Sequence, residues 1–413
     1  MFQSNIGLLT DVNFLFGLRV LFYASFALVP AVLIYILFDI WLEYKRGVWI
    51  QTQKHILLEI KVPREIYKSP KAVEFLMNGL FKKGDKEANW WEIYVLGQTR
   101  PVSSLEIVSI DGQVHFFVRV VFWLKEIVEA QIYSQYPGTE IYEVPDYTLP
   151  VLYDREKIGL VGTEFLLTKP DVFPIKTYVD YGMDKDPKEE FKIDPLTPFI
   201  EHIASFGRGH QFWLQIIIRA HKGTKKDATG KEYDPEWKHD AEKQIEDILK
   251  KAKGEKGEDG KYTASRFSTQ AEQDTITALD RSISKNGFDT GMRIIYIAPK
   301  DIFTTSNISG AVGSIMHFSS QNLNGFKASN WTGGKYTFPW QDRKKKKTTL
   351  EKKEMLDAYK RREYFFKPYK RKHFVLNTEE LATLFHFPGQ VSTTPTFTRI
   401  ESKKAEAPAN LPI

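Results

Sequence analysis

The chain has 413 residues, 42% of them hydrophobic and 27% charged, which is the composition of a folded protein with two or three domains. It contains no cysteine, and this excludes disulfides, thiol catalysis and cysteine-ligated zinc. The net charge of +6 would suit an anionic partner, although the location of that charge says more than its sum.

The first predicted element is a membrane-spanning helix near the N-terminus. The 19 residues from Val20 to Phe38 carry no charge, and at about 1.5 Å each they would span roughly 28 Å, close to the thickness of a hydrocarbon core. Trp41, Tyr44 and Trp49 follow, where an interfacial aromatic belt would lie. The alternatives are a buried core helix and a cleaved signal peptide, whose apolar region would be shorter.

The basic residues around this span predict its orientation. Only Arg19 precedes it, and five follow it: Lys45, Arg46, Lys54, Lys61 and Arg64. The positive-inside rule then puts the C-terminal side in the cytoplasm. We therefore expect a single-pass protein of the bacterial inner membrane, with membrane lipid as one partner.

The chain as a whole is predicted to be an α+β protein with four segments. The anchor takes residues 1–50, with its span at about 16–42, and an α/β domain of the ferredoxin-like kind follows at 51–150. A second α/β domain covers 151–335, and a basic linker with a short helical docking tail covers 336–413.

The first α/β domain has the element order of a ferredoxin-like sandwich. A strand begins at His55, a helix follows Pro70, and two strands flank the hairpin dipeptide Asp111-Gly112. A helix over 123–136 precedes the short strand EIYEV. The pattern is therefore βαββαβ.

The second α/β domain also alternates strands and helices. Strands are expected at EFLLTK, FWLQIIIRA and MRIIYIA. One helix follows Asp234-Pro235, and another begins at the capping box of Thr269 with Glu272. The unit can be interpreted as a degenerate copy of the first, although no sequence repeat is visible.

Positive charge is concentrated near the C-terminus. Between Asp342 and His373 there are 14 Lys or Arg residues and 5 Asp or Glu residues, a difference of 14 − 5 = +9. The candidate binding residues for a nucleic acid or another anionic partner are Arg343, Lys344, Lys345, Lys346, Lys347, Lys360, Arg361, Arg362, Lys370, Arg371 and Lys372. A solvated linker near a membrane surface is the alternative interpretation.

No pattern for catalysis or metal binding is found. Three lysines follow a glycine, as in a phosphate loop: Lys231, Lys261 and Lys335. None is followed by the Ser or Thr that would bind magnesium. The histidines His202, His210 and His221 flank a strand but lack paired ligand spacing. We expect no enzyme activity, no catalytic residue, no cofactor and no metal.

The segment FVLNTEELATLFHFPG carries a resemblance to a known family. It resembles the stretch that precedes the motor domain in membrane-anchored ATPases of type IV secretion and conjugation, members of the hexameric DNA-translocase superfamily. The matching positions are Leu376, Glu380, Leu381, Ala382, Leu384, Phe385, His386 and Pro388. The phrases LEIVSIDGQVHFFVRV and QIYSQYPGTEIYEVPDY also look like the N-terminal α/β region of those proteins.

This resemblance implies the non-motor part of such a machine, because the sequence ends at Ile413, where the motor would begin. The implied function is a non-catalytic membrane-anchored adaptor that tethers a separately encoded phosphate-loop ATPase. Asn377 with Glu380 forms a variant of the capping box, which predicts a short helix here. Leu381, Leu384 and Phe385 form an apolar face too small to be a core alone, so we expect a loosely ordered tail that docks on this partner. The alternative is a membrane-associated nucleic-acid-binding protein that uses the basic segment 343–372. DNA and further copies of the chain remain open as partners.

Overall fold

The computed structural model describes residues 4–63, 68–82, 89–185, 194–222, 225–226, 232–233, 236–253, 269–334, 336, 338 and 340–388. The side chains of residues 4–22, 24, 27, 225–226, 232–233, 236 and 251–253 are not described. The chain forms two compact units. Unit 1 comprises residues 1–53 and 85–99, and unit 2 comprises residues 54–84 and 100–413. The predicted segments place residues 85–99 in the first α/β domain, whereas the structure groups them with the N-terminal helix.

Unit 1 consists of the long helix α1 (Ser4–Thr52) and the π-helical turn η1 (Glu92–Leu96). The predicted N-terminal helix is present and extends beyond the predicted span on both sides. Among the residues described, no helix is long and apolar enough to cross a membrane. The predicted span from Val20 to Phe38 begins where the side chains lie outside the described residues.

The first part of unit 2 is a βαββαβ repeat, hereafter the first repeat. Its elements are β1 (His55–Lys61), α2 (Lys71–Leu80), β2 (Ser103–Ile110), β3 (Gln113–Val121), the 3-10 turn η2 (Phe122–Leu124), α3 (Lys125–Gln135) and β4 (Glu140–Glu143). The strands lie in the order β4-β1-β3-β2 with antiparallel neighbours. The hairpin turn has positive φ at Asp111 and Gly112, as its sequence predicted. The predicted ferredoxin-like element order is therefore observed.

A second repeat has the same connectivity. Its elements are β5 (Ile158–Leu167), α4 (Thr197–Ala204), β6 (Gln211–Ala220), β9 (Gly287–Pro299), α7 (Ser306–Ile315), the 3-10 turn η4 (Met316–Phe318) and β10 (Phe326–Ser329). The strand order β10-β5-β9-β6 is equivalent to that of the first repeat. The interpretation as a degenerate copy agrees with this connectivity.

Between β6 and β9 the second repeat carries an insertion. It contains β7 (Lys225–Lys226), β8 (Glu232–Tyr233), α5 (Glu236–Lys253) and α6 (Gln270–Ile283). The capping box predicted at Thr269 and Glu272 is present at the start of α6. The two helices pack on each other through a small apolar cluster that includes Ala241 and Leu279.

The two repeats share one sheet because β2 pairs with β6. These are equivalent strands, and they pair antiparallel from Ser103↔Ile218 to Ile110↔Gln211. Equivalent strands that pair antiparallel are related by an approximate two-fold axis normal to the sheet. β11 (Phe374–Asn377) adds a ninth strand beside the start of β9.

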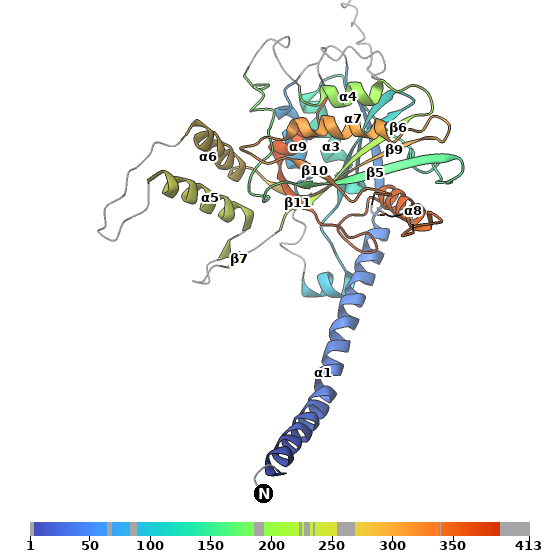
Figure 1. Cartoon of the computed structure of the whole chain (residues 1–413). Helices are drawn as coiled ribbons and strands as arrows, with labels where there is room; N and C mark the ends of the chain where they lie inside the picture. The colour runs from blue at the N-terminus through green and yellow to red at the C-terminus, as the bar shows by residue number, and fades with distance from the viewer. Residues whose placement is uncertain are drawn as a thin grey trace, which may run out of the picture. The chain divides into compact units, whose positions relative to one another are not determined.

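Helices cover both faces of this sheet (Figure 1). Side chains alternate along each strand, so that Leu214 and Ile216 face the large core under α2, α3, α4, α7 and α9 (Thr378–Leu384). Trp213 faces the opposite side and packs under α8 (Lys346–Arg361). Gly291 lets the chain after α8 lie close to β9, because a Cβ there would be 2.3 Å from the Tyr364 ring.

Two expectations for the C-terminal part are corrected by this structure. The predicted basic linker contains α8, whose residues Met355 and Tyr359 are buried against the sheet. The expected loosely ordered tail is instead buried as far as Pro388, with Leu381, Leu384 and Phe385 at 0%, 1% and 0% exposure. The apolar face is too small to form a core alone, but the two repeats supply the rest of one. The positions after Pro388 lie outside the described residues.

Candidate functional site

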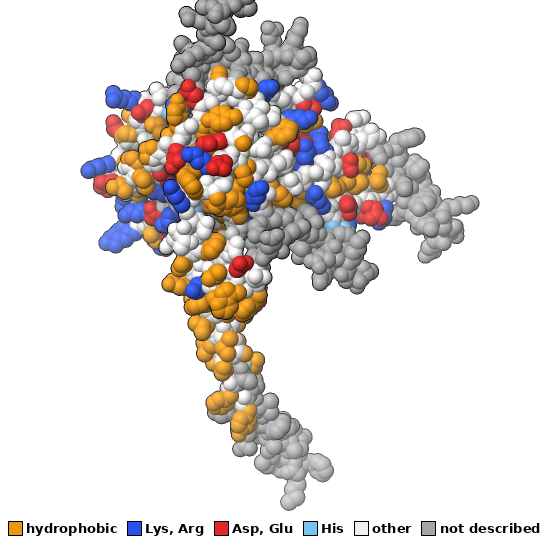
Figure 2. Space-filling view, turned by 180° about the vertical axis from the view of Figure 1, so that it is seen from behind, with side chains coloured by type: hydrophobic (Ala, Val, Ile, Leu, Met, Phe, Trp, Pro, Cys, Tyr) orange, Lys and Arg blue, Asp and Glu red, His pale blue; other side chains and the backbone are white. Residues whose placement is uncertain are grey.

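The predicted basic residues separate into an exposed group and a buried group. Arg343 and the run Lys344–Lys347 are exposed, and they lie just before and at the start of α8. Arg361 at the end of α8 and Lys370 and Lys372 after it are also exposed. Lys and Arg side chains gather at the left edge of Figure 2, the side on which α8 lies in that view. Arg362 is buried, Arg371 lies 3.6 Å from Glu164, and Lys360 donates to the carbonyl of Val151. The structure thus does not bring the eleven predicted basic residues together on one surface.

We define the basic patch as Arg343, Lys344–Lys347 and the neighbouring Arg155. The Arg155 guanidinium donates to the carbonyl oxygen of Lys344 at 3.0 Å and so joins the run from another part of the chain. The pKa of Lys352 in α8 is lowered, first by burial and then by the positive charges of Lys345 and Arg155. Concentrated positive charge of this kind favours an anionic partner.

Two exposed aromatic rings immediately precede the basic patch. Phe338 and Trp340 stack on each other with centroids 4.7 Å apart and planes 9° apart. Trp340 is 72% exposed. Exposed rings beside cations are the combination used for base stacking with phosphate contact.

A buried polar cluster lies where the repeats meet, on the α8 face of the sheet. Its centre is Glu106 in β2, which is fully buried. One carboxylate oxygen accepts hydrogen bonds from Ser104 at 2.7 Å, Gln215 at 2.8 Å and Arg362 at 3.0 Å. The other accepts from Tyr147 at 2.8 Å and Arg362 at 3.2 Å.

The charges of this cluster stabilise each other. Burial alone would raise the pKa of the Glu106 carboxyl, but Arg362 and the other donors lower it below its ordinary value. Burial acts against the Arg362 cation too, yet Glu106 and Asp146 raise its pKa well above the ordinary value. Glu106 is therefore a buried anion that requires Arg362.

The cluster continues across the sheet into β9. The Arg293 guanidinium donates to Gln215 at 2.8 Å and to the carbonyl oxygens of Ala358 and Glu363 at 3.0 and 2.9 Å. Arg362 and Arg293 thus hold the end of α8 onto both repeats. We call the set Glu106, Gln215, Arg293 and Arg362 the seam cluster. The role of this cluster was not predicted from the sequence, although Glu106, Gln215 and Arg293 are charged or amide side chains inside strands that are largely buried.

A second ion cluster surrounds Asp289 at the start of β9. Its carboxylate lies 2.8 Å from Arg219, 3.3 Å from Arg100 and 2.6 Å from His221. Burial would raise the pKa of Asp289, but His221 and the two arginines lower it to about 2. These contacts join β6, β9 and the segment before β2, which is a structural role.

The three histidines considered for a metal site, His202, His210 and His221, each contact a different partner. His202 contacts the Asn307 carbonyl at 3.0 Å, His210 contacts the Tyr296 hydroxyl at 2.9 Å, and His221 contacts Asp289. Within the part of the chain that is described, no three His, Cys, Asp or Glu side chains could hold a metal ion. The three lysines considered for a phosphate loop all lie outside the described residues.

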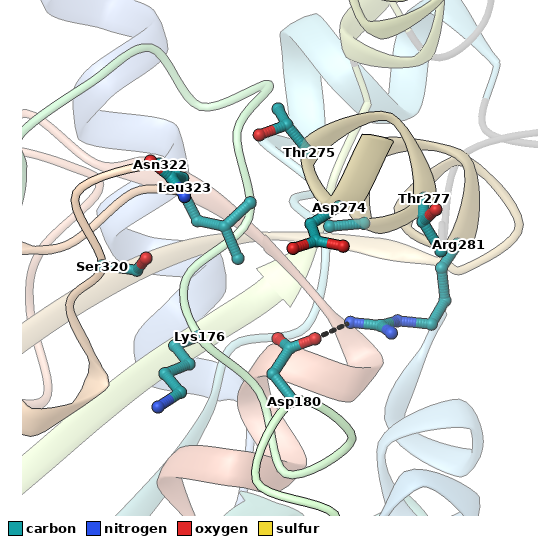
Figure 3. A pocket seen from close by; sticks show the side chains of 10 residues that line it. Lys176, Asp180, Asp274, Thr275, Thr277, Arg281, Ser320, Asn322 and Leu323 are labelled. Carbon is teal, nitrogen blue, oxygen red and sulfur yellow. Dashed lines mark hydrogen bonds and ion pairs between the residues drawn. The ribbon is translucent and has the colours of Figure 1, made fainter. Parts of the chain in front are cut away.

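A cavity of about 340 Å³ lies between α6 and two loops of the second repeat (Figure 3). Arg281 at its wall is held by Asp180 and Glu379, both at 2.9 Å. The Lys176 ammonium lies 3.9 Å from the centre of the Tyr181 ring. Arg281 thereby links α6 to α9 and to the loop of Asp180, whereas Lys176 contacts a ring of its own loop. These charged groups are engaged with other side chains and do not converge on one point in the cavity.

The tail, residues 374–388, is attached to both repeats by aromatic packing and by a hydrogen bond. Phe385 and Phe387 pack on Phe116 and Tyr136 of the first repeat, with centroids 5.7 and 5.2 Å apart. Glu380 accepts a hydrogen bond from the Ile175 amide at 2.8 Å in the second repeat. The capping box predicted for Asn377 with Glu380 is present at the start of α9. The tail therefore fastens the repeats together from the helical face.

The surface of α1 is apolar around its circumference. The consecutive residues Ile34, Tyr35, Ile36 and Leu37 are all exposed, at 66%, 74%, 46% and 66%. Four consecutive residues cover a full helical turn, so no polar side remains at this level. Such a surface requires cover by lipid or by another protein.

Comparison with known proteins supports a family assignment. Residues 45–399 match the family described as "Domain of unknown function (DUF8128)". The chain belongs to this family. The match begins within α1 and includes unit 2 as far as residue 399, together with η1 of unit 1. No curated protein matches the sequence.

The seam cluster predicts an inversion of the pH dependence of stability. Wild-type Glu106 has a lowered pKa, so its contribution is present above pH 4.5 and is lost as pH falls. In Arg362→Met the carboxyl keeps its burial without its cation, its pKa rises, and stability should fall as pH rises above 4.5. At neutral pH we expect a loss of about 3–5 kcal/mol in urea unfolding.

The control for this prediction is the double variant Glu106→Gln with Arg362→Met. It removes the uncompensated charge and should recover part of the missing stability at neutral pH. Equal destabilisation of the single and double variants, with no change in pH slope, would show that Arg362 acts by packing alone.

Proposed function

We propose that this protein is a non-catalytic, membrane-anchored scaffold of a type IV secretion-like or DNA-translocating complex. In this proposal α1 anchors the chain in the bacterial inner membrane, with unit 2 in the cytoplasm. Unit 2 holds a separately encoded phosphate-loop ATPase close to the membrane. The observation that carries the proposal is the docking of residues 374–388 into the core of unit 2.

That segment is the one that resembles the connector preceding the motor in membrane-anchored secretion ATPases. Its burial against Phe116 and Ile175 fixes the position of Pro388, the last described residue of the tail. A fixed Pro388 supports a tether, because a partner bound by the residues after it would stay at high effective concentration beside unit 2. Leu381, Leu384 and Phe385 are buried, so the proposed contact is assigned to residues after Pro388.

The anchor is supported by the circumference of α1. A helix whose residues 34–37 are all apolar and exposed is stabilised when lipid covers it. The non-catalytic role is supported by the buried charges of unit 2. Glu106 and Asp289 are each held by cations of the same chain, as expected of structural ion pairs.

Removing the residues after Pro388 should abolish capture of the partner. We expect a tagged full chain, purified from membranes, to retain a phosphate-loop ATPase that lacks its own anchor. A chain ending at Pro388 should be extracted equally well and show the same unfolding transition, but should fail to capture the ATPase. Retention by the shortened chain would exclude these residues as the tether, and no ATPase with the full chain would contradict the scaffold.

A second candidate function is nucleic-acid binding by the basic patch. The observation that favours it is the stacked pair Phe338 and Trp340 beside exposed cations. Rings that stack on bases and lysines that contact phosphates would bind single-stranded DNA with little sequence preference. This candidate needs no ATPase partner.

If the basic patch binds DNA, the affinity should fall as the salt concentration rises, and variants can separate the contribution of the lysines from that of the aromatic rings. Exchanging Lys344–Lys347 for Gln should reduce the slope of log affinity against log salt by about 0.7 for each phosphate that is no longer neutralised. Trp340→Ala should weaken binding of single-stranded DNA without changing that slope, because stacking releases no counterions. Lys243→Gln, at an exposed position on α5, serves as the control. Absence of binding at low salt would reject this candidate.

A further inference from the structure

We propose that residues 89–97, which include η1, form a second lipid contact that lies in the membrane interface beside α1. The inference rests on the proposed membrane anchor. It adds a second contact surface, residues 89–97, and places that surface at the level of the membrane interface. The partner is the headgroup and glycerol region of a phospholipid bilayer. The segment separates α2 from β2 in the sequence, although it belongs to unit 1.

The first observation is the close packing of this segment on α1. Tyr94 lies with its ring 5.8 Å from that of Phe38. Gly97 has a φ of +75°, and a Cβ there would be 2.4 Å from the backbone carbon of Lys45. Only glycine permits both this conformation and this approach. The segment is therefore fixed alongside the part of α1 from Phe38 to Lys45.

The second observation is the level at which this packing occurs. Phe38 is the last residue of the uncharged apolar run, and Lys45 lies seven residues later, about 10 Å along the helix. This length is enough to cross one interfacial layer, which is roughly 5–8 Å thick on each side of the hydrocarbon core. Between them Trp41 carries the Lys45 ammonium 4.7 Å from its ring centre, an arrangement suited to the polar boundary.

The third observation is the surface that the segment presents. Trp90 and Trp91 are 64% and 59% exposed, and Leu96 is 46% exposed. The turn that carries them is held by a hydrogen bond from the Asn89 amide to the Glu92 carboxylate at 2.9 Å. Adjacent exposed tryptophans beside the end of the uncharged apolar run of α1 match the preference of this residue for the membrane interface. A bilayer covers them together with the exposed turn of α1.

The depth of three positions in a bilayer tests this inference. The chain has no cysteine, so a single introduced cysteine can carry a fluorophore at one known site. Full chains with Trp91→Cys, Tyr35→Cys or Tyr133→Cys are labelled with a nitrobenzoxadiazole dye. They are reconstituted in phosphatidylcholine–phosphatidylglycerol vesicles with a nitroxide either near the headgroup or deep in the acyl chain. All three positions are exposed.

We expect the dye at position 91 to lose most of its emission to the shallow nitroxide and little to the deep one. The dye at position 35 should show the reverse, and the dye at position 133, on α3, should respond to neither. Quenching at position 35 without quenching at position 91 would overturn the lipid contact and leave the anchor intact. No quenching at position 35 would contradict the anchor itself.

Two further outcomes would also overturn the inference. Blue-shifted emission at position 91 that no nitroxide quenches would show that a protein covers the tryptophans. Equal shallow quenching at positions 91 and 133 would show that the membrane contact is not specific to residues 89–97.

Discussion

The pairing of β2 with β6 is the interaction on which unit 2 depends. It joins two four-stranded sheets into one and puts Glu106 and Gln215 opposite each other at the centre. Polar groups buried there must be hydrogen-bonded, since an unpaired buried carboxylate would cost several kcal/mol. Arg293 and Arg362 satisfy them, and Arg362 comes from the end of α8. The buried carboxylate of β2 therefore needs Arg362, and with it the C-terminal part of the chain, as its partner.

This arrangement also limits where function can lie. The buried charges of the seam cluster and of Asp289 are engaged in holding strands and helices, and the tail fastens the repeats from the other face. Among the described residues, the surfaces considered for partners are the apolar surface of α1, the tryptophans beside it and the basic patch. Surfaces of this kind suit binding, as the proposed scaffold requires. The apolar surfaces belong to unit 1 and the basic patch belongs to unit 2.

Local chemistry predicted much of the fold from the sequence. Strand alternation, the turn Asp111-Gly112 and the capping boxes at Thr269 and Asn377 act over a few residues, and all three are observed. The errors arose where the decisive partner is distant in the sequence. Arg362 was interpreted as a surface cation because Glu106, its partner, lies 256 residues away. Likewise, Phe385 was assigned to a loose tail because its neighbour Phe116 belongs to the first repeat.

The central claim is that the two repeats form one cooperative structure through the β2–β6 pairing, sealed by the seam cluster. Native-state hydrogen exchange of the full chain measures this most directly. The account predicts that the amides of Leu105 in β2 and Ile216 in β6 exchange only by global unfolding. They should do so with the same free energy as the amide of Ile294 in β9. Exchange at Leu105 with a clearly lower free energy, while Ile294 stays protected, would show that the first repeat opens alone and would contradict the account.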